Sequence, residues 1–82
     1  MQDRDEILNL LKDLIAEMFE ISRDDVAPAA SLSQDLDIDS IDAVDLMVKL
    51  RQVTGRRIQP EDFKSARTVQ DVVDTIYHLY NA

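Results

Sequence analysis

The sequence predicts an all-α fold: a four-helix bundle with three longer helices, one short helix and a long loop between the first two helices. Apolar side chains recur at helical spacing in three separate stretches. The chain has no alternating apolar and polar runs of the kind that strands need, and it contains only one glycine. At 82 residues it should form one domain, residues 1–82, close to the size at which a single core is only marginally sufficient.

The first helix is expected from Asp3 to Glu20, because apolar residues recur there every three or four positions with charged residues between them. Residues 21–39 lose this period and contain several Asp, Ser and Pro residues, which favour a long loop. Such a loop in so small a domain needs side chains that pack it in place. The residues that recur at this spacing in the first helix are Ile7, Leu8, Leu11, Leu14, Ile15, Met18 and Phe19, and the loop's packing candidates are Ile21, Val26, Leu32 and Leu36.

The second helix should begin at Asp39 or Ser40, either of which can cap it, and end near Thr54, with Gly55 just beyond. This helix has two apolar faces when it is drawn at about 100° per residue. The expected core face holds Ala43, Leu46, Met47, Leu50 and Val53, and the opposite face holds Ile41, Val44 and Val48.

A domain of this size can hardly bury both faces, so we expect the second one to be exposed. Asp45 borders this face and Asp42 lies further round the helix. Aliphatic groups beside carboxylates have the make-up of a docking surface for a basic partner. In the alternative interpretation, the long loop folds over this face and hides it.

Two further helices complete the prediction. Pro60 suits the first turn of a short helix that continues through Lys64. Thr68 can cap the last helix. The apolar stripe of that helix is formed by Val69, Val72, Val73, Ile76 and Leu79.

Charge and composition exclude several classes of function. The net charge of −8 disfavours binding to nucleic acid and favours partners with basic surfaces. Residues 1–48 carry 13 acidic and 3 basic side chains, whereas residues 49–82 carry 4 acidic and 6 basic ones. The chain has no cysteine, no apolar run long enough for a membrane span and an acidic N-terminus unlike a signal peptide. We therefore expect a monomeric cytoplasmic protein that provides no thiol of its own.

Ser40 is the candidate for chemistry, because the amides and dipole at the start of a helix favour an attached phosphate. Taken alone, an Asp-Ser pair in this position is more simply interpreted as a helix cap. The segment Leu36-Asp37-Ile38-Asp39-Ser40-Ile41-Asp42, followed by Val44-Asp45-Leu46, resembles the signature of the acyl carrier protein family. The resemblance extends over nearly the whole chain, from the long first helix to the Thr-Val-Gln-Asp-Val-Val start of the last one.

This resemblance implies that Ser40 receives 4′-phosphopantetheine from coenzyme A through a phosphopantetheinyl transferase and that Asp39 helps to present it. It also implies that Ile41, Asp42, Val44, Asp45 and Val48 recognise partner enzymes. Those partners would be of the ketosynthase, acyltransferase or ligase, ketoreductase and dehydratase types. The protein would carry acyl thioesters for fatty-acid or polyketide-type lipid biosynthesis and would have no catalytic residues of its own.

The sequence departs from the family pattern in two places. Asp37 stands where a glycine is often found, so the loop could approach the second helix differently. Lys49, Arg51, Arg56 and Arg57 stand near the end of that helix, where many fatty-acid carriers have glutamates. This basic end, together with similarity to discrete carriers of aryl polyene or type II polyketide clusters, favours a dedicated pathway.

Three other interpretations stay open at this point. A peptidyl or aminoacyl carrier would also use a modified serine here, although the flanking Asp39 and Asp42 favour the acyl type. Asp35, Asp37 and Asp39 imitate the start of a calcium-binding EF-hand loop, but Ser40 and Leu46 occupy the positions that need Gly and Glu. A hydrolase built on Ser40 and His78 lacks the G-x-S-x-G motif, and no metal site is expected.

Overall fold

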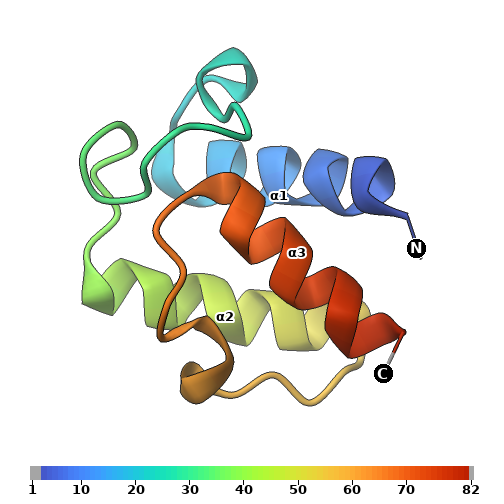
Figure 1. Cartoon of the computed structure of the whole chain (residues 1–82). Coiled ribbons are helices and arrows are strands. Elements are labelled where there is room, and N and C mark those ends of the chain that lie inside the picture. Colours follow the sequence, from blue (N-terminus) through green and yellow to red (C-terminus); the bar gives the residue numbers. More distant parts are fainter. Residues whose placement is uncertain (1–2, 82) are drawn as a thin grey trace.

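Three α-helices and two single-turn 3₁₀ helices make up the computed structural model, which describes residues 3–81. In chain order these are α1 (Arg4–Phe19), η1 (Arg23–Asp25), α2 (Ser40–Thr54), η2 (Pro60–Phe63) and α3 (Val69–Tyr80). Helices α1 and α2 run in opposite directions, and α3 crosses between them (Figure 1). The predicted all-α class is confirmed, with three longer helices, one short helix after Pro60 and a long loop before α2.

One continuous apolar core joins the three α-helices. Each helix contributes residues of its predicted stripe, and no polar or charged side chain is buried within residues 3–81. Leu8, Met18, Phe19 and Leu79, which the periodicity also assigns to these stripes, are only partly buried against the core. The buried residues are Ile7, Leu11, Leu14 and Ile15 from α1, Leu46, Met47 and Leu50 from α2, and Val69, Val72, Val73 and Ile76 from α3. Burial of each such side chain contributes about 1.5–3 kcal/mol, so this core is the main source of stability.

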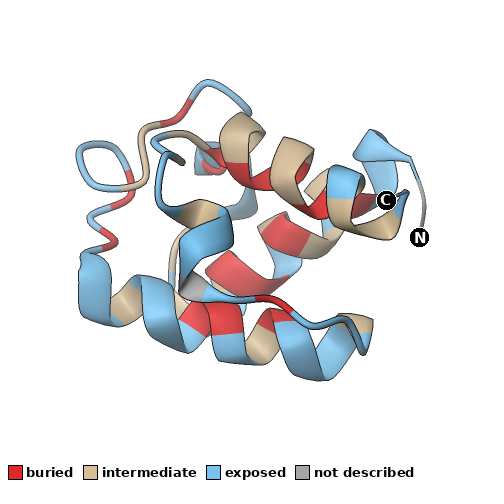
Figure 2. Ribbon diagram, turned by 60° about the horizontal axis from the view of Figure 1, so that its bottom comes forward, coloured by how far each residue is buried: buried red, intermediate tan, exposed pale blue. Residues whose placement is uncertain are grey.

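Two residues expected on the core face of α2 are not buried. Val53 remains 42 % exposed, because it lies at the edge of the stripe rather than near its centre. Ala43 is also exposed, although it lies close to the centre. Only the middle of the stripe is therefore buried, and in Figure 2 the remaining surface of α2 is mostly exposed.

The long loop between α1 and α2 is fixed to the start of α3 by backbone hydrogen bonds. The amide of Leu32 donates to the carbonyl of Arg67 (3.0 Å), and the amide of Val69 donates to the carbonyl of Ala30 (3.1 Å). Val26 and Leu36 are buried, as expected, while Ile21 and Leu32 are partly buried against the core. The loop therefore packs on the core as a folded segment.

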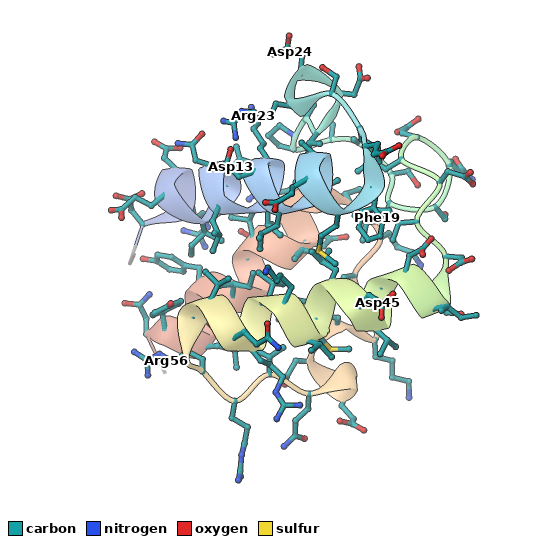
Figure 3. All side chains as sticks on the ribbon, turned by 180° about the vertical axis from the view of Figure 1, so that it is seen from behind. Asp13, Phe19, Arg23, Asp24, Asp45 and Arg56 are labelled. Carbon is teal, nitrogen blue, oxygen red and sulfur yellow. The ribbon has the colours of Figure 1, made fainter. Side chains whose placement is uncertain are left out.

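The sequence analysis did not predict η1 or the buried side chains of Ala30 and Ile38 within this loop. Arg23 in η1 donates a hydrogen bond to the carboxylate of Asp13 in α1, and Figure 3 shows these two side chains facing each other. Both are exposed, so this ion pair guides the loop's course but contributes little to stability.

The start of α3 is fixed by reciprocal capping. The amide of Asp71 donates to the Thr68 hydroxyl oxygen (3.2 Å), and the Asp71 carboxylate accepts hydrogen bonds from the amides of Arg67 (2.9 Å) and Thr68 (3.1 Å). These backbone hydrogen bonds hold the pKa of Asp71 below its ordinary value, because they stabilise the ionised form. The predicted cap at Thr68 is thus confirmed, and it sets the position of the segment that receives the long loop.

Glu20, which ends α1, adopts the left-handed conformation with φ 56°. A glycine takes this conformation without the steric cost that a Cβ atom imposes. The carboxylate is also unfavourable at a helix C-terminus, and α1 has no basic residue in its last turn. Helix α1 therefore has a suboptimal end.

We expect Glu20→Gly to raise the free energy of unfolding by about 0.5–1 kcal/mol, because it removes the conformational cost at the helix end. Urea denaturation followed by circular dichroism measures this change. Glu20→Ala is the matched control, since it removes the charge and keeps the Cβ atom. Equal stabilisation by both substitutions would show that charge alone, and not the backbone conformation, limits stability here.

Candidate functional site

Asp39 caps the start of α2 and so determines where Ser40 lies. The Asp39 Oδ1 atom accepts a hydrogen bond from the amide of Asp42 (2.9 Å), and its carbonyl accepts one from the amide of Ala43 (2.9 Å). Ser40 is the first residue of the helix, and it is exposed. The structure therefore presents the Ser40 hydroxyl at the accessible end of a well-capped helix.

The chain is anchored immediately before this helix. Ile38 is buried, and its amide donates to the carbonyl of Leu32 (2.8 Å). Asp37 adopts the left-handed conformation with φ 57°, which favours glycine and which aspartate tolerates better than most other residues. The backbone at this position thus has a conformation suited to glycine, although the side chain is an aspartate.

A cavity of about 290 Å³ opens beside Ser40. Its volume is near the lower end for small-molecule sites in proteins. Among the described residues that line it, Ser40 alone is polar; the others are Leu32, Ile38, Ala43, Val44, Leu46, Met47, Leu50, Phe63, Ala66 and Val72. The site therefore combines an exposed hydroxyl with an adjacent apolar chamber between α2, η2 and the long loop.

The sequence analysis did not predict this cavity. Its signal in the sequence is Ala43, a small residue near the centre of the core face of α2, which leaves room where a larger side chain would fill the space. Leu32 comes from the long loop, whereas Phe63 and Ala66 come from η2 and the turn that follows it, so no local pattern brings these walls to α2.

The second apolar face of α2 is exposed, as expected. Ile41 is 74 % exposed, Val44 49 % and Val48 46 %, and we call these three residues the apolar strip. Asp45 beside the strip is exposed, and Asp42 is half-buried. The alternative in which the long loop hides this face is wrong, because the loop is bonded to the segment before α3 instead.

The carboxylates that suggested a calcium loop have other roles. Asp35 Oδ2 accepts a hydrogen bond from the amide of Ser31 (2.6 Å), and Asp39 caps α2. Across residues 3–81, no three acidic, histidine or cysteine side chains are grouped in a way that could hold a metal ion. This arrangement gives no support to the EF-hand interpretation.

A serine hydrolase is also not supported by the geometry. His78 lies in the last turn of α3, exposed and in edge contact with the ring of Tyr77 (centroids 5.9 Å apart). In Figure 1 the end of α3 and the start of α2 lie at opposite sides of the molecule. His78 therefore does not lie beside Ser40, as a base that activates a catalytic serine must.

The helices described by the structure include none that is long and apolar enough to cross a membrane.

Comparison with known proteins agrees with this geometry. Residues 9–76 match the family described as "Phosphopantetheine attachment site". The chain is 51 % identical over 77 residues to "Acyl carrier protein 2" of Ralstonia nicotianae, covering 94 % of this chain and 95 % of that protein. It is 36 % identical over 74 residues to an acyl carrier protein of Thermosynechococcus vestitus, covering 90 % and 91 % of the two chains.

A solved structure gives the same result for the fold. The acyl carrier protein of Enterococcus faecalis superimposes with a TM-score of 0.74 at 30 % sequence identity, covering 93 % of this chain and 96 % of that one. The bundle described above is therefore the fold of that protein as well.

We expect Asp39→Ala to lower the free energy of unfolding by about 1 kcal/mol, because it removes the side-chain cap of α2. Asp39→Asn should lose much less, since asparagine caps a helix about as well as aspartate. Urea denaturation of both variants measures the difference. A loss in Asp39→Asn as large as that in Asp39→Ala would show that the negative charge, and not the hydrogen bond to Asp42, supports the helix.

Proposed function

The chain belongs to the acyl carrier protein family, whose members carry acyl groups on phosphopantetheine, and on this premise we propose that Ser40 is the residue to which the arm is attached. The observation that carries the proposal is the exposed Ser40 hydroxyl at the capped start of α2, within the Asp39-Ser40-Ile41 motif. Attachment needs a hydroxyl that a second enzyme can reach, and exposure of Ser40 meets this need.

The residues around Ser40 are suited to a phosphoester. The Asp39 side chain accepts a hydrogen bond from the amide of Asp42. The amides of Ser40 and Ile41 precede it in the first turn, where backbone amides have no partner inside the helix. These amides and the helix dipole favour a negative group at Ser40. When attached, the arm supplies the terminal thiol that holds the cargo as a thioester and that a cysteine-free chain lacks.

The cavity beside Ser40 supports an apolar acyl chain as the cargo. Its walls are side chains such as Leu46, Met47 and Phe63, which offer van der Waals contact and no hydrogen-bond partners. An acyl chain sheltered there is removed from water, and burial of each methylene group contributes about 0.8 kcal/mol. The same walls would exclude water from the acyl chain while the carrier travels between enzymes.

The apolar strip supports the role of α2 in partner recognition. The strip starts at Ile41, directly after Ser40, so an enzyme that covers the strip also reaches the attachment point. The carboxylates of Asp42 and Asp45 would attract a basic enzyme surface. Asp39 would act through the cap, which holds Ser40 in position.

Within this role, the partners we propose are a phosphopantetheinyl transferase and enzymes of the ketosynthase, acyltransferase or ligase, ketoreductase and dehydratase types. The carrier would act in the cytoplasm as a monomer without catalysing a reaction. Its pathway would be a fatty-acid or polyketide-type lipid synthesis, and the basic residues after α2 favour a dedicated pathway over bulk fatty-acid synthesis.

Incubation with coenzyme A and a broad-specificity phosphopantetheinyl transferase should add one phosphopantetheine to each chain, as measured by intact mass spectrometry. Ser40→Ala should abolish the gain completely, because it removes the hydroxyl that is modified. Ser33→Ala, which changes an exposed serine in the long loop, is the control and should be modified fully. Modification of Ser40→Ala to the same extent as the wild-type protein would rule out Ser40 as the attachment site.

Val48→Asp and Asp45→Lys should each slow acyl transfer to or from partner enzymes by about tenfold, equivalent to about 1.4 kcal/mol. Both residues are exposed, so helix content and thermal stability should remain unchanged. Val53→Asp is the matched control, since Val53 is an equally exposed valine on the same helix but outside the strip. A comparable rate loss in Val53→Asp would mean that the strip has no specific role in docking.

A further inference from the structure

A basic groove lies at the far end of α2 from Ser40, in a chain whose net charge is −8. It is a shallow, open groove of about 520 Å³, lined by Val48, Arg51, Gln52, Gly55, Arg56 and Arg57. None of its lining residues is acidic, whereas the start of α2 carries Asp39, Asp42 and Asp45. Figure 3 shows Asp45 and Arg56 toward opposite ends of this helix. The two ends of this helix therefore have opposite charge.

The backbone of the groove is held in a fixed conformation. Gly55 ends α2 with φ 67°, and its amide donates to the carbonyl of Arg51 (3.0 Å). The Arg56 guanidinium lies over the ring of Tyr80, 4.7 Å from its centroid, so one of the three cations is already oriented. An oriented guanidinium loses less side-chain entropy when it binds an anion.

The positive charge of the groove is not neutralised by the protein itself. Within residues 3–81, Arg51 and Arg57 form no ion pair, and both are exposed. Arg51 alone is in the last turn of α2, where it complements the helix dipole. Arg56 and Arg57 lie beyond the helix end, so the dipole does not account for them. Three neighbouring cations that repel one another are most favourable when an anionic group binds between them.

The groove continues the apolar strip along the same face of α2. Val48 belongs to both, and Arg51, Gln52 and Gly55 follow it at positions that return to this face of the helix. At 1.5 Å per residue, Arg51 lies about 16 Å along the helix from Ser40. A partner that covers the strip therefore reaches the groove without leaving this surface.

Given the carrier function proposed above, we infer that the basic groove is a second docking point, which receives carboxylate side chains from the surface of a condensing enzyme. That enzyme would present basic residues to the start of α2 and acidic residues about 16 Å away, matching the charge pattern of the helix. An enzyme whose docking surface is basic throughout is rejected, because its cations would meet Arg51, Arg56 and Arg57. A second copy of this chain is a poorer occupant, since two molecules of charge −8 repel each other.

The test compares two doubly substituted holo carriers of equal net charge. Arg51→Glu/Arg57→Glu reverses the charge of the groove, and Lys12→Glu/Lys64→Glu makes the same change in total charge outside it. The probe is a purified β-ketoacyl synthase from the same organism that elongates the acyl group on the wild-type carrier. We measure kcat/KM for elongation, the extent of modification at Ser40 and the thermal stability of each variant.

The groove variant should show a loss of at least tenfold in kcat/KM, whereas the control variant should change less than threefold. Both should be modified at Ser40 as completely as the wild-type carrier. Equal losses in both variants, or no loss in either, would overturn the inference while leaving the carrier function intact. Absence of modification in the wild-type protein would instead overturn the proposed function.

Two further measurements keep the test decisive. Arg51→Gln/Arg57→Gln removes charge without reversing it and should give a smaller loss in the same direction, which covers the case in which the glutamate variant unfolds. Sedimentation velocity of the wild-type carrier should show a monomer. A dimer that disappears in the glutamine variant would assign the groove to a second copy and overturn the inference.

Discussion

The structure depends on one constraint: a domain of 82 residues can bury only one face of α2. Leu46, Met47 and Leu50 fill that face and join the core shared with α1 and α3. The apolar strip on the opposite side cannot be buried in the same bundle, so it remains exposed at some cost in solubility and stability. The same constraint that holds α2 in the bundle thus leaves its outer surface available to other proteins.

The cap at Asp39 converts this arrangement into a site. It holds the first turn of α2, and the buried Ile38 anchors the chain just before it, so that Ser40 lies between an anchored loop and a capped helix. The apolar cavity lies on one side of Ser40 and the strip runs along the helix away from it. Ser40 therefore adjoins both an apolar chamber and an exposed apolar surface, which we propose receive the cargo and the enzymes that act on it. The basic groove extends that surface and gives it a direction, because the charge changes sign along the helix.

Local patterns predicted most of the fold and the main elements of the site. The periodicity of α1 and α3, the caps at Asp39 and Thr68 and the glycine after Thr54 are all short-range signals, and each is confirmed. The misses have a common cause, which is that they depend on contacts between distant segments. The cavity requires Leu32, Phe63 and Ala66 to meet α2. The left-handed conformation of Asp37 is likewise set by the path that the loop must follow to reach α2. The role of Ser40 rested on a resemblance to a family, because a capped helix alone does not distinguish an attachment site from a simple cap.

The division of α2 between cargo and partners is tested most directly by nuclear magnetic resonance of the carrier loaded with an octanoyl group. Nuclear Overhauser effects between the acyl methylenes and the side chains of Leu46, Met47 and Phe63 are predicted, because these residues line the cavity beside Ser40. The methyl groups of Ile41 and Val48, which do not line the cavity, should show no such contacts and should be broadened by a soluble paramagnetic agent. Acyl contacts with the strip in place of the cavity, or an acyl chain that contacts neither, would contradict this division.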